Sequence, residues 1–197
     1  GAEDPRLAFE TTRREPVLTA GARIGLALCT LVVDASGAYR AEQVYLTENR
    51  TEQFLDVRLP QGAALWSASV DGDFVKPVAA AGGDERLARI PLVKTADGDL
   101  DFRVVLKYGG QLARPSPLRR TDFPFVESLN VNVELAQVEL RLPGAYRWML
   151  FDGTLRPLEE EGDFEAGILS YQNKTAKRLM KTLQYGNVFE QTRALSN

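Results

Sequence analysis

The chain has 197 residues, of which 44% are hydrophobic and 26% charged, the balance of a globular protein that buries its own core. It has no histidine and one cysteine, which excludes an intrachain disulfide, the usual Ser-His-Asp and Cys-His catalytic groups and most zinc sites. A net charge of −3 argues against a nucleic-acid partner, and no apolar run approaches the roughly 18 residues that a membrane-spanning helix needs.

Most of the chain alternates apolar and polar residues, the pattern of strands that bury one face. The clearest cases are residues 54–59, where Leu55 and Val57 share a face, and residues 100–108. Residues 22–34 are apolar at odd and even positions alike, which predicts a central strand covered on both faces. After an irregular lead-in over residues 1–21, we expect strands at 22–34, 38–47, 54–59, 65–70, 74–77, 86–93, 100–108 and 131–142.

The breaks between these strands have their own signals. Asp71-Gly72 predicts a tight hairpin, and Pro91 predicts a strand end or a sheet edge. Residues 109–125 contain two glycines and three prolines, which indicates a long crossing or a boundary between two sub-units. The apolar positions of the last strand change phase near Leu135, which predicts a bulge.

The C-terminal segment, residues 164–197, differs from the rest. Its apolar residues recur at spacings of three and four, which predicts an amphipathic helix that ends at Gly186. The sequence leaves open whether this stripe packs on the strands or on another chain, and its basic residues are interpreted as a solvated face. We predict a partner-binding stripe formed by Leu169, Ala176, Leu179, Met180 and Leu183.

One phrase occurs nearly twice, as "RLPQGAALWSASVDGDFVKP" at 58–77 and as "RLPGAYRWMLFDGTLRP" at 141–157. Each copy has a strand, a Pro-Gly corner, a tryptophan and an Asp-Gly turn. We interpret this as internal duplication and expect Trp66 and Trp148 to be core anchors. The predicted fold class is therefore all-β: an antiparallel β-sandwich, immunoglobulin-like or related, of two duplicated halves with a C-terminal amphipathic helix.

The predicted organisation is an irregular lead-in at 1–21, the β-sandwich at 22–163 and a helical tail at 164–197. Two separate small domains are the alternative. Because the chain begins with Gly1 rather than methionine, we expect it to be a piece of a longer protein.

The stretch "NRTEQFLDVRLPQGAALWSASVDGDFVKPV", continuing to Tyr108, resembles segments of large uncharacterised bacterial envelope proteins with β-sandwich modules. The shared pattern joins Gln-Phe-Leu, Leu-Pro, Gly-Ala, Leu-Trp-Ser, Val-Asp-Gly and Lys-Pro, and it covers about half of the chain. The resemblance implies an extracytoplasmic location, in the periplasm or at the cell surface, and a membrane-anchored parent. It implies no enzymatic activity.

No group of residues stands out as catalytic. Asp71 and Asp152 occupy matching places in the two phrases, but an Asp before Gly is what a tight turn selects, so a glycosidase pair is not predicted. The acidic segment 97–101 lacks a complete calcium loop and is interpreted as solvated charge. We therefore predict no metal and no cofactor.

The predicted function is that of a non-catalytic interaction or spacer module in a larger bacterial extracytoplasmic protein. The expected partner is protein, either other domains of the parent or a second copy. The alternative is a module that binds carbohydrate or another ligand, with Tyr45 and Phe151 as candidate aromatic platforms.

Overall fold

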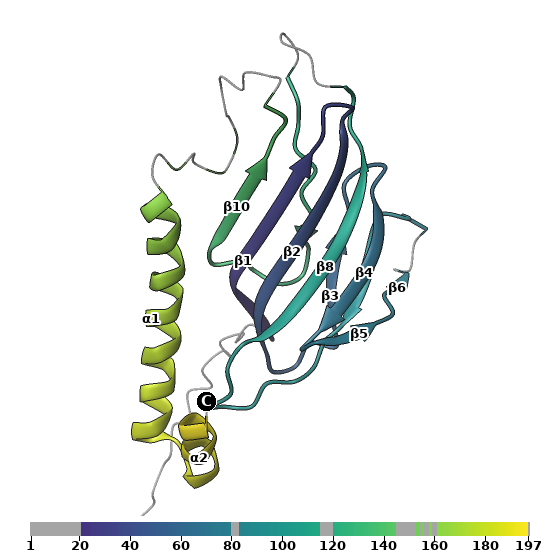
Figure 1. The fold of residues 1–197 in the computed structure, drawn as a ribbon. Helices are drawn as coiled ribbons and strands as arrows, with labels where there is room; N and C mark the ends of the chain where they lie inside the picture. Colours follow the sequence, from purple (N-terminus) through teal and green to yellow (C-terminus); the bar gives the residue numbers. More distant parts are fainter. Residues whose placement is uncertain are drawn as a thin grey trace, which may run out of the picture.

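The structure is a computed structural model that describes residues 21–79, 83–114, 120–144, 153, 155, 158 and 161–196. In these residues the chain forms two β-sheets and a pair of C-terminal helices (Figure 1). Nearly all of the predicted lead-in lies outside them, as do Trp148, Phe151 and Asp152.

The larger sheet has six strands in the order β10-β1-β2-β8-β4-β5, and the smaller has four in the order β6-β7-β3-β9. The six are β10 (Ala136–Arg141), β1 (Ala22–Val33), β2 (Ala38–Asn49), β8 (Phe102–Gln111), β4 (Ala64–Val70) and β5 (Asp73–Val75). The four are β6 (Val78–Ala79), β7 (Leu87–Pro91), β3 (Phe54–Arg58) and β9 (Glu127–Ser128). The helices are α1 (Glu161–Tyr185) and α2 (Val188–Ser196).

The eight expected strands are present with shifted ends, and the last begins only at Ala136. Pro91 is the final residue of its strand, as predicted. The short strands β6 and β9 and the second helix were not predicted from the sequence. α1 ends immediately before Gly186, as predicted, and the Gly186 amide donates to the Thr182 carbonyl.

The turns form for the reasons that the sequence gives. Asp71 has φ 52° and Gly72 has φ 93°, the two left-handed residues of a tight hairpin between β4 and β5. Between β1 and β2, the Asp34 carboxylate accepts hydrogen bonds from the Ser36 and Ala38 amides, while Gly37 takes φ 89°. These turns fix the registers of both hairpins.

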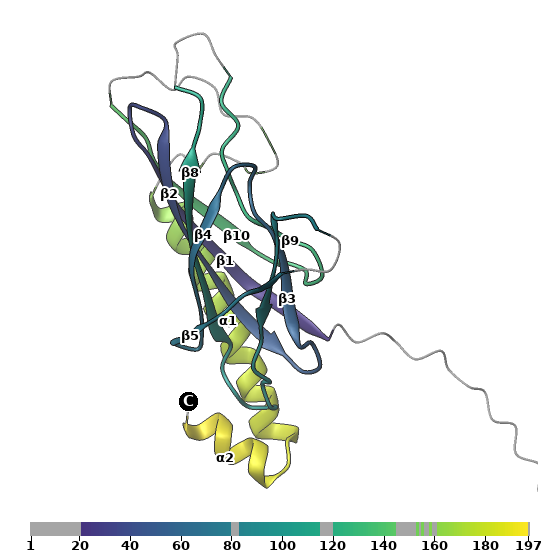
Figure 2. The same ribbon diagram turned by 90° about the vertical axis from the view of Figure 1, so that its right-hand side faces the viewer.

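Side chains from both sheets form one hydrophobic core. Ile24, Val104 and Leu106 of the six-stranded sheet belong to the same buried cluster as Leu55, Val57 and Ile90 of the four-stranded sheet. The predicted inward positions are therefore confirmed for the strand at 54–59 and for Phe102, Val104 and Leu106 of the strand predicted at 100–108, whereas Leu100, predicted to point inward with them, precedes the strand and is 43% exposed. Figure 2 shows the sheets edge-on, with β3 and β9 on one side and α1 on the other side of the larger sheet.

A second buried cluster lies nearer the β1–β2 turn and contains Cys29, Leu31 and Tyr108. Cys29 is buried, and burial raises the pKa of its thiol to about 11. Phe123 and Phe125, from the predicted crossing, pack against this cluster. The Tyr108 hydroxyl donates to the Pro124 carbonyl over 2.9 Å.

The position of Trp66 corrects the sequence prediction. The alternation of β4 was expected to point Trp66 inward with Ala68 and Val70, but its side chain is 60% exposed. The register with β8 shifts between Leu65 and Ser67, so Trp66 is the extra residue of a β-bulge. A bulge breaks the alternation, because two residues on one strand oppose one on the other. Trp66 consequently lies on the outer face.

The pairing of β10 also differs from the expected all-antiparallel arrangement, since β10 runs parallel to β1 with Ala136 opposite Ala27. A hairpin would force antiparallel pairing, but the chain reaches β10 from β9 of the other sheet, which imposes no such constraint. The strand before the first repeated phrase, β3, and the strand before the second, β10, thus belong to different sheets. Most of the second phrase lies outside the described residues.

Candidate functional site

The helix α1 turns a largely polar side toward the six-stranded sheet. Tyr171, Lys174 and Arg178 recur at spacings of three and four residues, so they share one side of the helix. All three contact acidic side chains of the β-region: Tyr171 and Arg178 reach Asp101, and Lys174 reaches Glu134. An amphipathic helix usually packs its apolar side on a sheet, and here that side is not the one in contact.

Arg178 is the centre of this interface. Its guanidinium donates to Glu48 of β2 over 2.7 Å and to Asp101, immediately before β8, over 2.8 Å. The Asp101 side chain is only 1% exposed and also accepts the Tyr171 hydroxyl over 2.7 Å. Glu48 is bonded further to Arg23 at 2.7 Å. A buried carboxylate held in this way depends on its cation, because losing one partner leaves a desolvated charge.

The electrostatics of the interface follow from these contacts. Burial alone raises the pKa of the Glu48 carboxyl, but the hydrogen bond from Arg23 and the positive charges of Arg178, Arg23 and Arg50 outweigh it, so that its pKa lies below the usual value. Burial, together with the bond to Asp101, raises the pKa of the Tyr171 hydroxyl. Both groups therefore keep the protonation states that the interface needs at neutral pH.

Two glycines allow the helix to approach. A Cβ on Gly25 of β1 would lie 2.8 Å from a ring carbon of Tyr171, and a Cβ on Gly167 of α1 would collide with the amide of Gln137 in β10. Gly25 is also the extra residue where the β1–β2 register shifts, between Ile24 and Leu26. The sequence did not predict this interface. The residues that form it are two isolated glycines and charged residues that are far apart in the chain, and they follow no local pattern.

The predicted apolar stripe faces away from the sheet. Leu169 is 57% and Met180 63% exposed, Ala176 is exposed, and Leu179 and Leu183 are half-buried. Leu169, Ala176, Met180 and Leu183 follow one another at spacings of seven, four and three residues, on the opposite side of the helix from Arg178. We call the five predicted residues the outer stripe.

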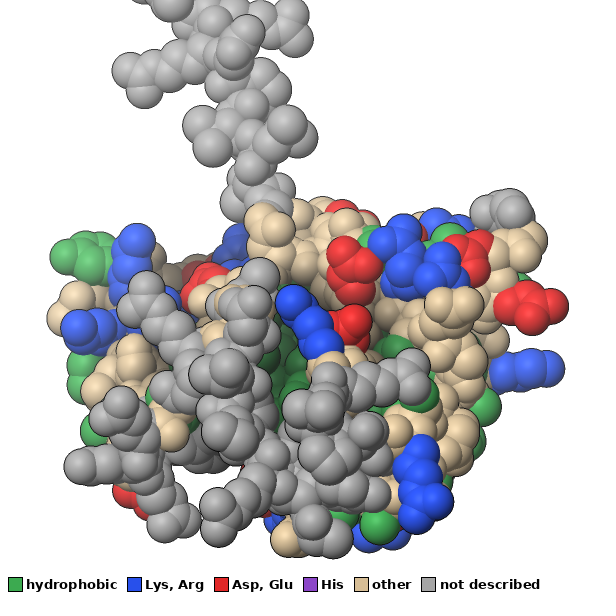
Figure 3. All heavy atoms as spheres, turned by 90° about the horizontal axis from the view of Figure 1, so that it is seen from above, with side chains coloured by type: hydrophobic (Ala, Val, Ile, Leu, Met, Phe, Trp, Pro, Cys, Tyr) green, Lys and Arg blue, Asp and Glu red, His purple; other side chains and the backbone are tan. Residues whose placement is uncertain are grey.

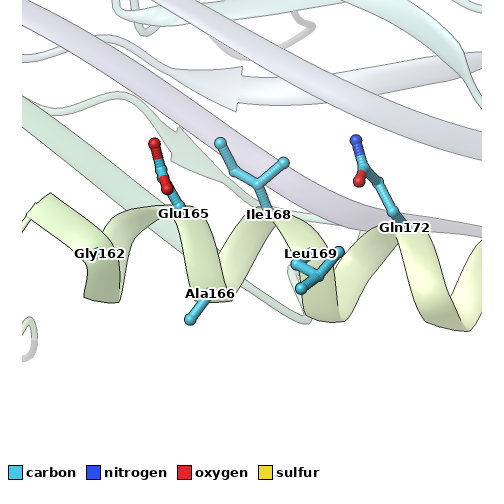
Figure 4. Close-up of a pocket in the computed structure, with 6 residues that line it drawn as sticks. All are labelled: Gly162, Glu165, Ala166, Ile168, Leu169 and Gln172. Carbon is cyan, nitrogen blue, oxygen red and sulfur yellow. The ribbon is translucent and has the colours of Figure 1, made fainter.

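A shallow hollow of about 460 Å³ lies at the N-terminal end of the outer stripe. Figure 4 shows Glu165, Ile168 and Gln172 projecting from one side of α1, while Ala166 and Leu169 project from another. Gly162 completes the described lining. The hollow is open and mainly apolar, and its polar groups do not converge on one point, as those of a small-molecule site would.

The second helix continues the exposed apolar surface. α2 packs against the end of α1, where the Gln191 amide donates to the Leu183 carbonyl, and its Ala194 is buried beside the turn at Gly98. Its other apolar side chains project into solvent: Val188 and Leu195 are about three-quarters exposed and Phe189 is 86% exposed. The helical pair thus carries two exposed apolar areas, on α1 and on α2.

The structure places the two aromatic platform candidates as follows. Tyr45 lies in the core cluster between the sheets with 2% exposure, so its ring presents no face to a ligand. The prediction was wrong because Tyr45 was assigned to the outward positions of its strand, whereas Val44, Tyr45 and Gln43 are all buried. Phe151 lies outside the described residues.

A second hollow, of about 500 Å³, lies where α2 meets the turn before β8, and its ion pairs join Arg50 to Asp97 and Arg193 to Asp99. In the part of the chain that the structure describes, three or more Asp, Glu, Cys or His residues do not cluster as metal ligands. Acidic and basic side chains are interspersed at the end of the molecule seen in Figure 3.

Neither α1 nor α2, the helices of the described part of the chain, is long and apolar enough to cross a membrane.

The comparisons with known proteins are limited to weak structural likenesses. No family model matches the chain, and no curated protein does. A two-domain M1 zinc metallopeptidase mutant bound to L-arginine is 16% identical over 64% of this chain and 33% of its own, with a TM-score of 0.40. The M1 zinc metallopeptidase from Deinococcus radiodurans is 17% identical over 46% and 20%, with a TM-score of 0.36.

Aminopeptidase A from Legionella pneumophila, in complex with aspartic acid, is 6% identical over 50% of this chain and 11% of its own, with a TM-score of 0.35. The chain thus spans a third or less of the length of these solved proteins. Likeness at this level transfers neither fold nor activity to the present chain.

Proposed function

We propose that the protein is a non-catalytic interaction module and that the helical pair is its contact surface. The observation that carries the proposal is the inverted packing of α1, whose polar side docks on the sheet while Leu169, Ala176 and Met180 of the outer stripe are left exposed. Exposed apolar surface of this kind is unfavourable in water and is typical of a surface that binds protein.

The docking contacts support this proposal, because they give the helix a fixed orientation. Arg178 binds two strand-region carboxylates at once, and Gly25 leaves room for Tyr171 beside it. The outer stripe is thereby presented on a rigid support, which lowers the entropic cost of binding a partner.

The proposed partner is a second copy of the chain or another domain of its parent. We propose further that the parent is a membrane-anchored bacterial envelope protein and that this segment is extracytoplasmic; both proposals rest on the sequence resemblance alone. For the fold, we propose a β-sandwich, supported by the core that both sheets share. Its immunoglobulin-like character and the duplicated halves stay predictions.

Light scattering coupled to size exclusion tests the contact surface on the full chain over a wide range of concentrations. The unaltered chain is expected to self-associate, and Leu169→Gln with Met180→Gln is expected to leave it monomeric. Both side chains are more than half exposed, so the double variant should retain its fold. Val78→Gln with Leu129→Gln is the control, since both residues are exposed and lie in or next to the four-stranded sheet rather than beside the helices.

Binding of a hydrophobic dye by the same variants separates the two kinds of partner. A monomeric chain whose dye binding falls in the stripe variant but not in the control would favour a partner from another domain. A monomeric chain with equal dye binding in all variants would contradict the proposal, because the outer stripe would then not be an accessible apolar surface.

A further inference from the structure

The outer face of the six-stranded sheet carries a second feature, far from the outer stripe, around Trp66. The bulge between Leu65 and Ser67 turns this side chain outward, and its ring lies over Gly109 of β8. A Cβ on Gly109 would collide with two atoms of the ring. The bare backbone of a glycine is therefore what allows an exposed tryptophan to lie against the sheet.

The register shows which side chains surround this ring. Arg40 of β2 is opposite Gly109, and it points outward because its neighbours Tyr39 and Ala41 are both buried. Lys107 is opposite both Glu42 and Ser67, and it pairs with Glu42 at 3.2 Å. The tryptophan thus has polar and charged neighbours on the adjacent strands.

A second exposed aromatic lies on the same face. Phe74 of β5 is 84% exposed and is opposite Ser69, which alternates with the buried Ala68 and Val70. Trp66 and Phe74 therefore project outward from neighbouring strands. Two large aromatic side chains on one sheet face, with polar and charged groups beside Trp66, form an extended surface for flat, partly apolar rings.

The charge of this face selects among such ligands. Glu42 is neutralised by Lys107, whereas Arg40 and Arg103 are exposed on the same face and have no acidic partner among the described residues. The face therefore presents an unpaired positive charge at Arg40, beside Trp66, in a chain whose net charge is −3. Arginine binds carboxylates with two parallel hydrogen bonds, which adds geometric selectivity.

We propose that this face binds an acidic polysaccharide, with one sugar ring stacked on Trp66, its carboxylate bound by Arg40, and a further ring against Phe74. The apolar C–H face of a pyranose suits the indole ring, and the carboxylate suits the unpaired guanidinium. This site does not depend on the helical contact surface, and either can fail without the other.

The test uses calorimetric titration of the full chain with tetragalacturonate and with its methyl ester, which has the same rings but no charge. The acid is expected to bind and the ester to bind about tenfold more weakly, the size of one charge-assisted contact. Trp66→Ala is expected to weaken binding of the acid by roughly tenfold, the upper range for one aromatic contact. Arg40→Gln is expected to remove the preference for the acid over the ester.

Gly109→Ala tests the placement of the ring, since it keeps Trp66 but fills the space beneath it. It is expected to weaken binding, and a melting measurement shows whether it remains folded. Phe189→Ala is the control, because it removes an even more exposed aromatic from α2 and should leave the affinity unchanged. Equal affinity for acid and ester, binding unaffected by Trp66→Ala, or no heat up to millimolar ligand would each overturn the proposal.

Discussion

Asn49 is a fully buried amide that joins the end of β2 to the connection leading toward β8. Its side chain donates to the carbonyls of Glu52 and Val93 over 2.7 and 2.8 Å and accepts the Glu52 amide over 2.9 Å. Asn49→Ala leaves these part-buried backbone groups without partners and removes a fully buried amide, and we expect it to lower the free energy of unfolding by about 2–3 kcal/mol. Urea denaturation measures this loss.

Asn130 supplies the control for this prediction. It makes two comparable hydrogen bonds, to the Phe54 carbonyl and from the Asp56 amide, but it is exposed. Because water can replace a lost partner there, Asn130→Ala should cost about 1 kcal/mol or less. Equal losses for the two variants would mean that burial does not determine the importance of Asn49.

At the residue scale, the sequence predicted the regular positions and missed those set by bulges. Leu55, Val57, Val104 and Leu106 are buried as their alternation requires. Trp66 was misplaced because it is itself the extra residue of a bulge in β4, and alternation contains no mark of a bulge. Tyr45 was misplaced because consecutive apolar residues leave the phase of a strand undetermined.

At the element scale, α1 shows why an amphipathic pattern does not reveal the direction in which a helix packs. The sequence located the helix and its end at Gly186. It could not show that Arg178 and Tyr171 contact the sheet, since their partners Glu48 and Asp101 are 70 or more residues away in the chain. The polar docking is a tertiary feature without a local signal.

Arg178→Ala tests whether these contacts hold α1 in place. The change leaves the Asp101 carboxylate buried with the Tyr171 hydroxyl as its partner, and breaking a buried ion pair in this way costs about 3–5 kcal/mol. We expect a lower free energy of unfolding and faster proteolytic cleavage within α1. Lys181→Ala, which removes an exposed charge from the same helix, should have little effect on either measurement.

The same interface predicts a loss of stability in acid. The folded-state pKa of Glu48 lies below its usual value of 4.5, so its contribution is complete above that pH and is lost as the pH falls through the folded-state pKa. Glu48→Gln should be less stable than the unaltered chain at neutral pH and should lose less stability on acidification below about pH 4.5. Denaturation at several pH values measures how the free energy of unfolding of each protein changes with pH.

Glu127→Gln is the control for the acid prediction. Glu127 pairs with Arg58, but its side chain is 62% exposed. Its pH dependence should therefore match that of the unaltered chain. If the free energy of unfolding of Glu48→Gln also changed with pH as that of the unaltered chain does, Glu48 would not couple protonation to folding.

At the scale of the whole molecule, the sequence predicted a mostly β chain with a helical end, because strand alternation and helical spacing are local and repeat many times. It did not predict that β10 would lie parallel to β1, or that the strands before the two repeated phrases would belong to different sheets. Strand partners depend on where the chain crosses between layers, and the crossings through β9 have no periodic signal.

Because the two sheets share a buried cluster, we predict that they unfold together. Ile90 of β7 is fully buried in the cluster that includes Val104 and Leu106 of the other sheet. Ile90→Ala should cost about 2–5 kcal/mol, and this loss should also appear in a probe that lies in the six-stranded sheet. The fluorescence of Trp66, read in a Trp148→Phe background, provides that probe.

Coincident denaturation curves from Trp66 fluorescence and from far-UV circular dichroism, both shifted equally by Ile90→Ala, are expected if the sheets unfold together. Val78→Ala, at an exposed position in the edge strand β6, should shift neither curve appreciably. A fluorescence curve that stayed in place while the dichroism curve moved would show that the sheets unfold separately. The buried cluster would then be two cores in contact, because a destabilisation in one sheet would not reach the other.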